Sequence, residues 1–205
     1  QDTGGNTIIS SNSTGTFTSN LPAVAPNVST ATGTLPIANG GTGTTSYSPG
    51  ITVADQWRIT SSFTNSGGAS TALTTNWERG DSGGAGYIVG ISESSGIFSM
   101  PSTGIYLIQA TFFSDGSAYS GTNNYVGLRI DTTLNDSSYD RATDTYQGKY
   151  QINYQNSAGC SFMFDVTDVS THKFKIVVES LQDAIYMGNS TRQRTGFNII
   201  RLGDT

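Results

Sequence analysis

Beyond about residue 55, the chain alternates apolar and polar side chains with a period of two, the spacing typical of β-strands. Val126, Leu128 and Ile130 alternate with more polar neighbours, and residues 174–178 repeat the pattern with Phe, Ile and Val. Short segments rich in Gly, Ser, Asn and Asp separate these runs, as turns do. No segment shows a convincing helical period. The pattern therefore predicts an all-β sandwich or jelly roll.

One predicted strand, residues 104–113, is apolar on both of its faces. Ile105 and Leu107 alternate there with Tyr106 and Phe112. A sandwich standing alone would leave one of these faces partly exposed. We therefore expect the head to associate with further copies of itself, and to bury Tyr106 and Phe112 in that contact.

The first part of the chain lacks this pattern. Residues 1–54 carry a single charge, Asp2, and consist mostly of Gly, Ser, Thr, Asn and small apolar side chains. Such a segment buries too little apolar surface to offset the entropy lost on folding. We expect residues 1–50 to form an extended arm that depends on partners for order, followed by a globular domain over residues 55–205.

Composition narrows the class of partner. Of the 205 residues only 12% are charged, and the net charge is −5, which argues against a nucleic-acid partner. No apolar run approaches the length of a membrane span, so membrane insertion is not expected. The single cysteine, Cys160, excludes an intramolecular disulfide, and its apolar neighbours predict a buried structural thiol.

Residues 95–108 carry a recognisable signature, with Gly96, Phe98, Pro101 and Gly104 preceding Tyr106. The run resembles the G-x-F-x-x-P-x-x-G-x-Y signature of the tumour necrosis factor (TNF) and complement globular-head superfamily. The resemblance covers roughly residues 55–203, and it implies a ten-stranded jelly roll that forms a homotrimer. The sheet that this superfamily packs around its threefold axis adds two candidate contacts, and the complete set is Trp57, Tyr106, Phe112 and Phe197.

Residues 35–46 carry a second resemblance, to the L-P-[apolar]-A-N-G-G-T-G repeat of bacteriophage tail fibres and other virion fibres. It implies a stalk or docking segment in the arm, whose candidate residues for contact with other virion proteins are Leu35, Pro36, Ile37, Asn39, Gly40 and Gly41. The expected protein is a trimeric fibre or spike on the virion surface, whose head attaches to a host glycan or protein. A capsid-attached head fibre or decoration protein without a receptor role and a secreted lectin-like module remain alternatives.

A tyrosine-rich segment is the candidate receptor contact. Its aromatic residues are Tyr139, Tyr146, Tyr150 and Tyr154, set among amides and a few charges. Tyrosine combines a flat apolar face with a hydroxyl at low entropic cost, which suits stacking on sugar rings. The alternative is that these tyrosines only cover the sandwich or its trimer contacts.

One motif suggests protease chemistry that the remaining sequence does not support. Residues 80–84 match the nucleophile loop of chymotrypsin-like proteases, but the only histidine, His172, follows Ser82 instead of preceding it. We expect no enzymatic activity.

An aspartate cluster, formed by Asp131, Asp136, Asp140 and Asp144, matches no calcium loop. A solvated turn is therefore favoured, no cofactor is expected, and calcium is the alternative.

Overall fold

The computed structural model describes residues 9–11, 17–19, 50–115, 124–149 and 155–205. The chain divides into two compact units, Gln1–Pro49 and Gly50–Thr205. In the first unit β1 (Ile9–Ser11) pairs antiparallel with β2 (Phe17–Ser19). The second unit, here called the head, is built from strands alone over its described residues.

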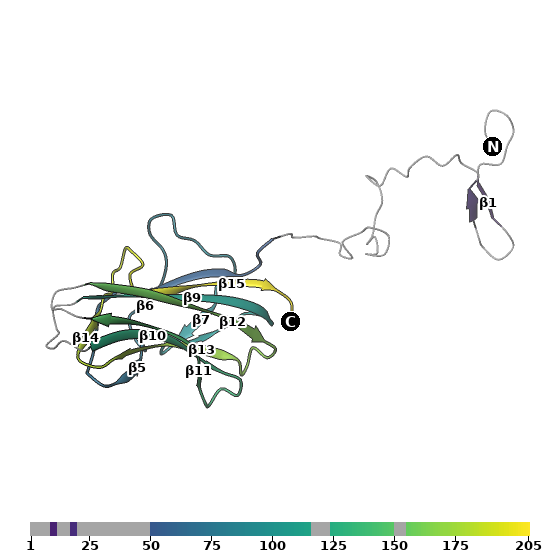
Figure 1. Ribbon diagram of the computed structural model, residues 1–205. Helices are drawn as coiled ribbons and strands as arrows, with labels where there is room; N and C mark the ends of the chain where they lie inside the picture. The colour runs from purple at the N-terminus through teal and green to yellow at the C-terminus, as the bar shows by residue number, and fades with distance from the viewer. Residues whose placement is uncertain (1–8, 12–16, 20–49, 116–123, 150–154) are drawn as a thin grey trace. The chain divides into compact units, whose positions relative to one another are not determined.

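The head is a sandwich of two antiparallel sheets, seen as two layers in Figure 1. The β9 sheet has the order β4-β14-β9-β15-β3-β6, with β12 paired to β9, and the β10 sheet has the order β11-β10-β13-β8-β7, with β5 paired to β13. The strands of the β9 sheet are β3 (Ala54–Ile59), β4 (Phe63–Asn65), β6 (Trp77–Arg79), β9 (Gly104–Asp115), β12 (Asn156–Val166), β14 (Ala184–Tyr186) and β15 (Gly196–Gly203). The strands of the β10 sheet are β5 (Ser70–Ala72), β7 (Ser92–Ser94), β8 (Ile97–Ser99), β10 (Asn124–Thr133), β11 (Asp140–Lys149) and β13 (Lys173–Ser180). The all-β prediction is confirmed.

An aromatic cluster joins the two sheets at the centre of the core. Phe98 of β8 is fully buried and stacks on Phe174 of β13, with ring centroids 5.1 Å apart. From the β9 sheet, Trp57, Trp77 and Phe197 approach Phe98 at 5.5, 5.1 and 4.6 Å in edge-to-face geometry, the arrangement that aromatic quadrupoles favour. One ring therefore contacts aromatic residues from both layers.

The signature residues around β8 and β9 have structural roles. Gly96 has a φ of +80°, and a Cβ at this position would overlap the carbonyl oxygen of Leu73, so only glycine fits. Gly104 has a φ of +143° and is equally constrained by the Arg201 side chain. Tyr106 is buried, and its hydroxyl donates to the carbonyl oxygen of Ser102 at 2.8 Å, which closes the turn before β9.

The structure corrects the choice of trimer-contact residues. Trp57 is 8% exposed, and the other three are fully buried within one chain. A side chain with almost no exposed surface in a single chain has almost none left to bury against a second copy. The four corrected residues belong to the core cluster between the two sheets and are Trp57, Tyr106, Phe112 and Phe197. Trimerisation itself stays a prediction, and its contacts must come from other side chains.

Candidate contact and recognition surfaces

The outer face of the β9 sheet, here called the contact face, carries a row of aliphatic side chains. Cross-strand pairing places Ala54, Ile200, Leu107 and Met163 side by side across β3, β15, β9 and β12. Met163 is 65% exposed, and Leu202, farther along β15, is 55% exposed. The sequence predicts that both faces of β9 are apolar, and this aliphatic row lies on the outer one.

A row of amides and a hydroxyl runs beside the aliphatic row on the contact face. It consists of Gln56, Asn198, Gln109 and Ser161, again paired across neighbouring strands. The amide oxygen of Asn198 is buried and has no hydrogen-bond partner within the described residues. The two rows together contain no charged side chain. These two rows suit burial against another protein surface, because association over them desolvates no ion. The charged side chains of the same face, Arg58, Glu78 and Asp165, lie in the rows on either side.

The outer face of the β10 sheet, here called the recognition face, is charged by contrast. Tyr146 of β11 lies on this face, 40% exposed, and its hydroxyl donates to Glu179 Oε2 at 3.0 Å. The same carboxylate oxygen accepts from Arg129 and Arg141, each at 3.1 Å. Arg141 also donates to the Tyr146 hydroxyl oxygen at 2.9 Å, so the phenol is fixed from both sides.

Further ion pairs extend this network. Arg129 holds both carboxylate oxygens of Asp131, at 2.8 and 3.2 Å, and Arg141 pairs with Asp144 at 3.1 Å. Burial and the hydrogen bond to Glu179 raise the pKa of Tyr146, so the phenol stays neutral and remains a donor at physiological pH. A bidentate arginine pair and a shared carboxylate give this network a defined geometry.

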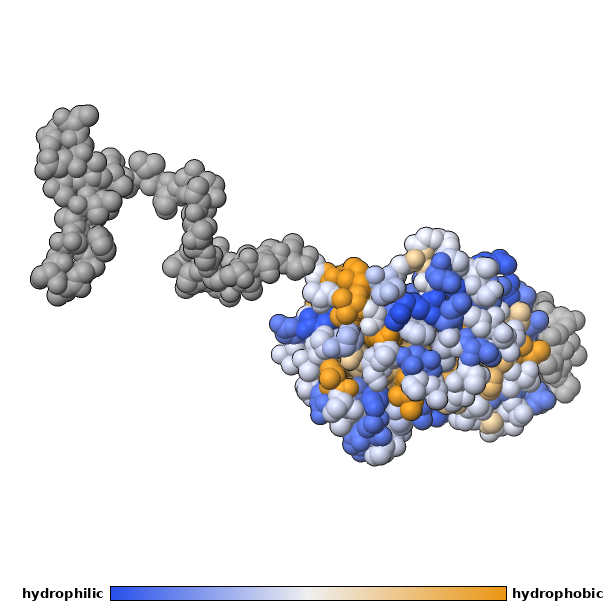
Figure 2. Space-filling view, turned by 180° about the vertical axis from the view of Figure 1, so that it is seen from behind, coloured by the Kyte–Doolittle hydropathy of each residue, from blue (hydrophilic) through white to orange (hydrophobic). Residues whose placement is uncertain are grey.

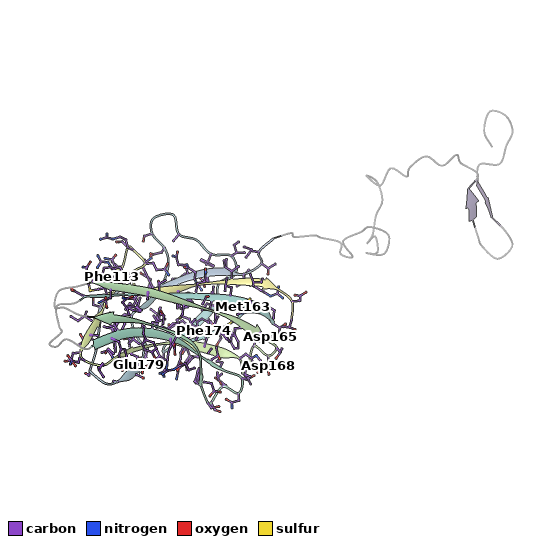
Figure 3. The ribbon with its side chains drawn as sticks, in the orientation of Figure 1. Phe113, Met163, Asp165, Asp168, Phe174 and Glu179 are labelled. Atoms are coloured by element: carbon purple, nitrogen blue, oxygen red, sulfur yellow. The ribbon has the colours of Figure 1, made fainter. Side chains whose placement is uncertain are left out.

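Gly127 lets the Tyr146 ring lie flat against the sheet. It faces Tyr146 in the β10–β11 register, and a Cβ at residue 127 would overlap the Cδ1 atom of the ring. Tyr125 then meets the Tyr146 ring edge-on, with centroids 5.2 Å apart. The result is a pre-positioned aromatic surface with a fixed hydroxyl, which is what stacking on a ligand requires. Figure 3 labels Glu179 on the layer that carries this surface.

The structure describes one of the other three candidate tyrosines, Tyr139. Tyr139 is half-buried under Lys175, whose Nζ lies 4.1 Å from the ring centroid, and its hydroxyl has no partner within the described residues. Burial and the nearby Asp136 raise the pKa of Tyr139. Tyr150 and Tyr154 lie outside the described residues. Of the two predicted receptor contacts that the structure describes, Tyr146 is therefore the more exposed one.

Ser82 and His172 are in different parts of the head. The Ser82 hydroxyl donates to the carbonyl oxygen of Thr191 at 2.9 Å, in a hollow of about 570 Å³ under the Gly-rich loop. His172 lines a separate hollow and stacks on Phe164 with ring centroids 5.9 Å apart. The serine therefore lacks the adjacent base that nucleophilic catalysis requires.

Basic side chains pair with three of the four aspartates in the predicted cluster. Asp131 and Asp144 pair with arginines, and Asp136 pairs with Lys173 at 2.6 Å. Over the part of the chain that the structure describes, no three acidic, histidine or cysteine side chains come together as metal ligands. The calcium alternative therefore receives no support from the positions of these side chains.

Two remaining expectations concern Cys160 and the arm. Cys160 is half-buried, and burial with the nearby Asp144 raises the pKa of its thiol to about 11, which keeps it protonated. Residues 35–41 of the predicted docking segment lie outside the described residues.

No helix among the described residues is long and apolar enough to span a membrane. The exposed apolar surface in Figure 2 forms separate patches on the head. Ile88 and Val89 are among the exposed apolar residues, at 49% and 60%.

Solved structures with the same architecture belong to the TNF family. The Eiger TNF of S. frugiperda superimposes with a TM-score of 0.55 at 13% identity, over 76% of this chain and 95% of that one. Murine APRIL at pH 5.0 gives a TM-score of 0.50 at 11% identity, over 73% and 98% of the two chains. No protein-family model and no curated protein matches the sequence. The head therefore has a TNF-like jelly-roll fold, and identities this low carry the likeness no further.

Proposed function

We propose that this chain is a structural protein of a virus particle: a homotrimeric fibre or spike whose head projects outward and attaches to the host surface. The supporting observation is the difference between the two outer faces of the head. One carries two adjacent rows without a charged side chain and suits burial between copies, whereas the other presents a fixed, exposed tyrosine. The virion assignment itself rests on the resemblance of residues 35–46 to fibre sequences.

The trimer would form through the contact face. Leu107 and Ile200 are half-buried within one chain, and Met163 and Leu202 are largely exposed, so association would remove further apolar surface from water. A donor from a neighbouring copy would also satisfy the Asn198 amide oxygen. In a closed cyclic trimer, each copy contributes the same two surface regions, so one substitution is present at all three interfaces.

Attachment would use the recognition face. Tyr146 offers its ring and the fixed hydroxyl, and the surrounding arginines and carboxylates pair with one another. A single contact of this kind is weak, so adhesion would depend on several copies per trimer and several trimers per particle. Tyr146→Ala should therefore reduce adsorption to host cells while leaving the oligomeric state unchanged.

Immunogold electron microscopy tests the assignment to a virion. An antibody against residues 50–205 is applied to purified particles of the virus whose genome encodes this chain. Gold at the tail or at the capsid surface is expected, and its position distinguishes a tail fibre from a capsid-attached head fibre or decoration protein. A chain that stays in the culture fluid and never sediments with particles would contradict the proposal and favour the secreted lectin-like alternative.

A further inference from the structure

A half-open hollow of about 640 Å³ lies at one end of the sandwich, separate from the recognition face and meeting the contact face at Met163 and Asp165. It is formed by the connection between β10 and β11, at residues 132–140, and by the end of β12 with the turn that follows, at residues 162–172. Figure 3 labels Met163, Asp165 and Asp168 toward this end of the head. The volume is within the range of small-molecule sites in proteins.

The walls of the hollow combine apolar and polar groups. Leu134 and Phe162 supply an apolar side, and Leu134 is 63% exposed. Asp140 and Asp165 supply carboxylates, and among the described residues neither carboxylate has a hydrogen bond or an ion pair. Unpaired carboxylates on an apolar wall disfavour an anion and provide acceptors for a ligand that donates hydrogen bonds.

His172 adds a ring nitrogen to the walls of the hollow. It lines the hollow but is only 8% exposed, and it is held by stacking on Phe164. The Nδ1 atom lies 3.2 Å from both the backbone nitrogen of Thr167 and the carbonyl oxygen of Asp165, so the proton is on Nε2 in the tautomer that accepts from Thr167 and on Nδ1 in the tautomer that donates to Asp165. Nε2 has no partner among the described residues, and a ligand group that both donates and accepts fits either tautomer.

The ligand that these walls fit best both accepts and donates hydrogen bonds within one small, partly apolar body. An ammonium or guanidinium group only donates, so it would satisfy Asp140 and Asp165 but would fit His172 only in the tautomer whose Nε2 accepts. A sugar hydroxyl does both, and the C–H face of a pyranose ring is apolar enough to lie against Phe162 and Leu134. The loop is also pre-formed, because the Asn135 side-chain oxygen accepts from the Ser138 backbone N–H at 2.9 Å.

We propose that this hollow is a binding site for a neutral pyranose. Asp140 and Asp165 accept from its hydroxyls, His172 Nε2 forms a hydrogen bond with one of them, and the apolar wall contacts the ring. This inference deepens the proposed host attachment and rests on it for its biological role, because it assigns a carbohydrate to the head. It is separate from the Tyr146 surface, which lies on the outer face of the β10 sheet.

Saturation-transfer difference NMR on the full chain tests the site with methyl glycosides of glucose, galactose, mannose and N-acetylglucosamine. Saturation should pass from the protein to the ring protons of at least one glycoside, with a Kd of about 1 mM. Asp140→Ala should weaken this binding by about tenfold, since it removes a charged acceptor. Asp165→Ala repeats the test on a second exposed carboxylate, and near-UV circular dichroism checks that each variant is folded.

The matched control is Asp204→Ala, which removes an exposed carboxylate outside the hollow and should leave the affinity within about twofold. The proposal is overturned if no glycoside receives saturation, if Asp140→Ala and Asp165→Ala bind as well as the original chain, or if n-butylamine binds the hollow and the glycosides do not. The gold-labelling result is independent of these outcomes. A chain that binds a glycoside but never sediments with particles loses the virion assignment alone, and labelled particles without glycoside binding lose the site alone.

Discussion

The two outer faces of the sandwich carry opposite chemistry on the same scaffold. Across the contact face, Gln109 and Leu107 of β9 stand in rows of amides and aliphatic side chains without a charge. Across the recognition face, Arg129, Glu179 and Arg141 form a continuous network around Tyr146. Strand alternation gives both sheets an apolar inner face, so the inner faces say little about function. The outer faces differ in the chemistry of their side chains, and the proposed function rests on that difference.

The largest expected effect is on the core that supports both faces. Phe98→Ala removes the ring that contacts Phe174, Phe197 and both tryptophans, and should lower the free energy of unfolding by about 3–5 kcal/mol. Urea unfolding measures this loss. The control Phe113→Ala, at a half-buried residue on the outer side of β9, should cost clearly less. Equal losses would mean that Phe98 is not central to the sandwich.

A charge on the contact face should break the assembly. Leu107→Asp places a carboxylate in the middle of the aliphatic row, and burying it without a partner is prohibitive. Light scattering at micromolar concentration should show a trimer for the full chain and a monomer for the variant. Because Leu107 is half-buried, Leu202→Asp at a more exposed position repeats the test. Leu181→Asp, at a turn away from this face, should remain trimeric, and a monomeric unmodified chain would contradict the trimer.

A single methyl group on the recognition face should displace the aromatic surface. Gly127→Ala puts a Cβ where the Tyr146 ring lies, and overpacking of this kind costs about 1–3 kcal/mol. Gly203→Ala is the matched control, because nothing lies within 4 Å of a Cβ at that strand position. Denaturant unfolding should separate the two variants, and host adsorption should fall only for Gly127→Ala. Equal stability and equal adsorption would remove the structural role assigned to Gly127.

A smaller effect should appear at high pH, where Cys160 titrates between the two sheets. Burial and Asp144 raise the pKa of its thiol from 9.0 to about 11 in the folded chain. The folded chain therefore favours the protonated thiol. The contribution of the thiol to the free energy of unfolding is complete below pH 9 and is lost as the pH rises toward 11. Cys160→Ala should show a shallower loss of stability over this window than the original chain. Parallel stability curves would show that the thiol is not perturbed.

How far the sequence predicted the molecule depends on the range of the interactions involved. Gly96 takes a positive φ in the turn before β8, and Tyr106 bonds to Ser102 four residues earlier, so the spacing of these residues correctly indicated a TNF-like fold. The trimer residues were misplaced because both faces of β9 are apolar, and alternation alone does not tell the inner face from the outer one. The larger aromatic side chains, Tyr106 and Phe112, turned out to fill the core.

The recognition face and the hollow depend on contacts that no local pattern reveals. Glu179 reaches Arg129 and Arg141 only through the register of β13 with β10 and of β10 with β11. Asp140 and His172 are far apart in the sequence, and they come together because the turns that carry them meet at one end of the sandwich. Tyr146 was predicted as a surface residue, but its fixed hydroxyl required the cross-strand partners.

Hydroxyl-radical footprinting of the full chain tests most directly the claim that one face is buried and the other is free. In a single chain Met163 and Leu202 are 65% and 55% exposed, and Tyr146 is 40% exposed. In the trimer, Met163 and Leu202 should be oxidised several times more slowly than in the Leu107→Asp variant, whereas Tyr146 should react equally in both. Equal oxidation of Met163 and Leu202 in the two proteins, or protection of Tyr146 in the trimer, would contradict the account.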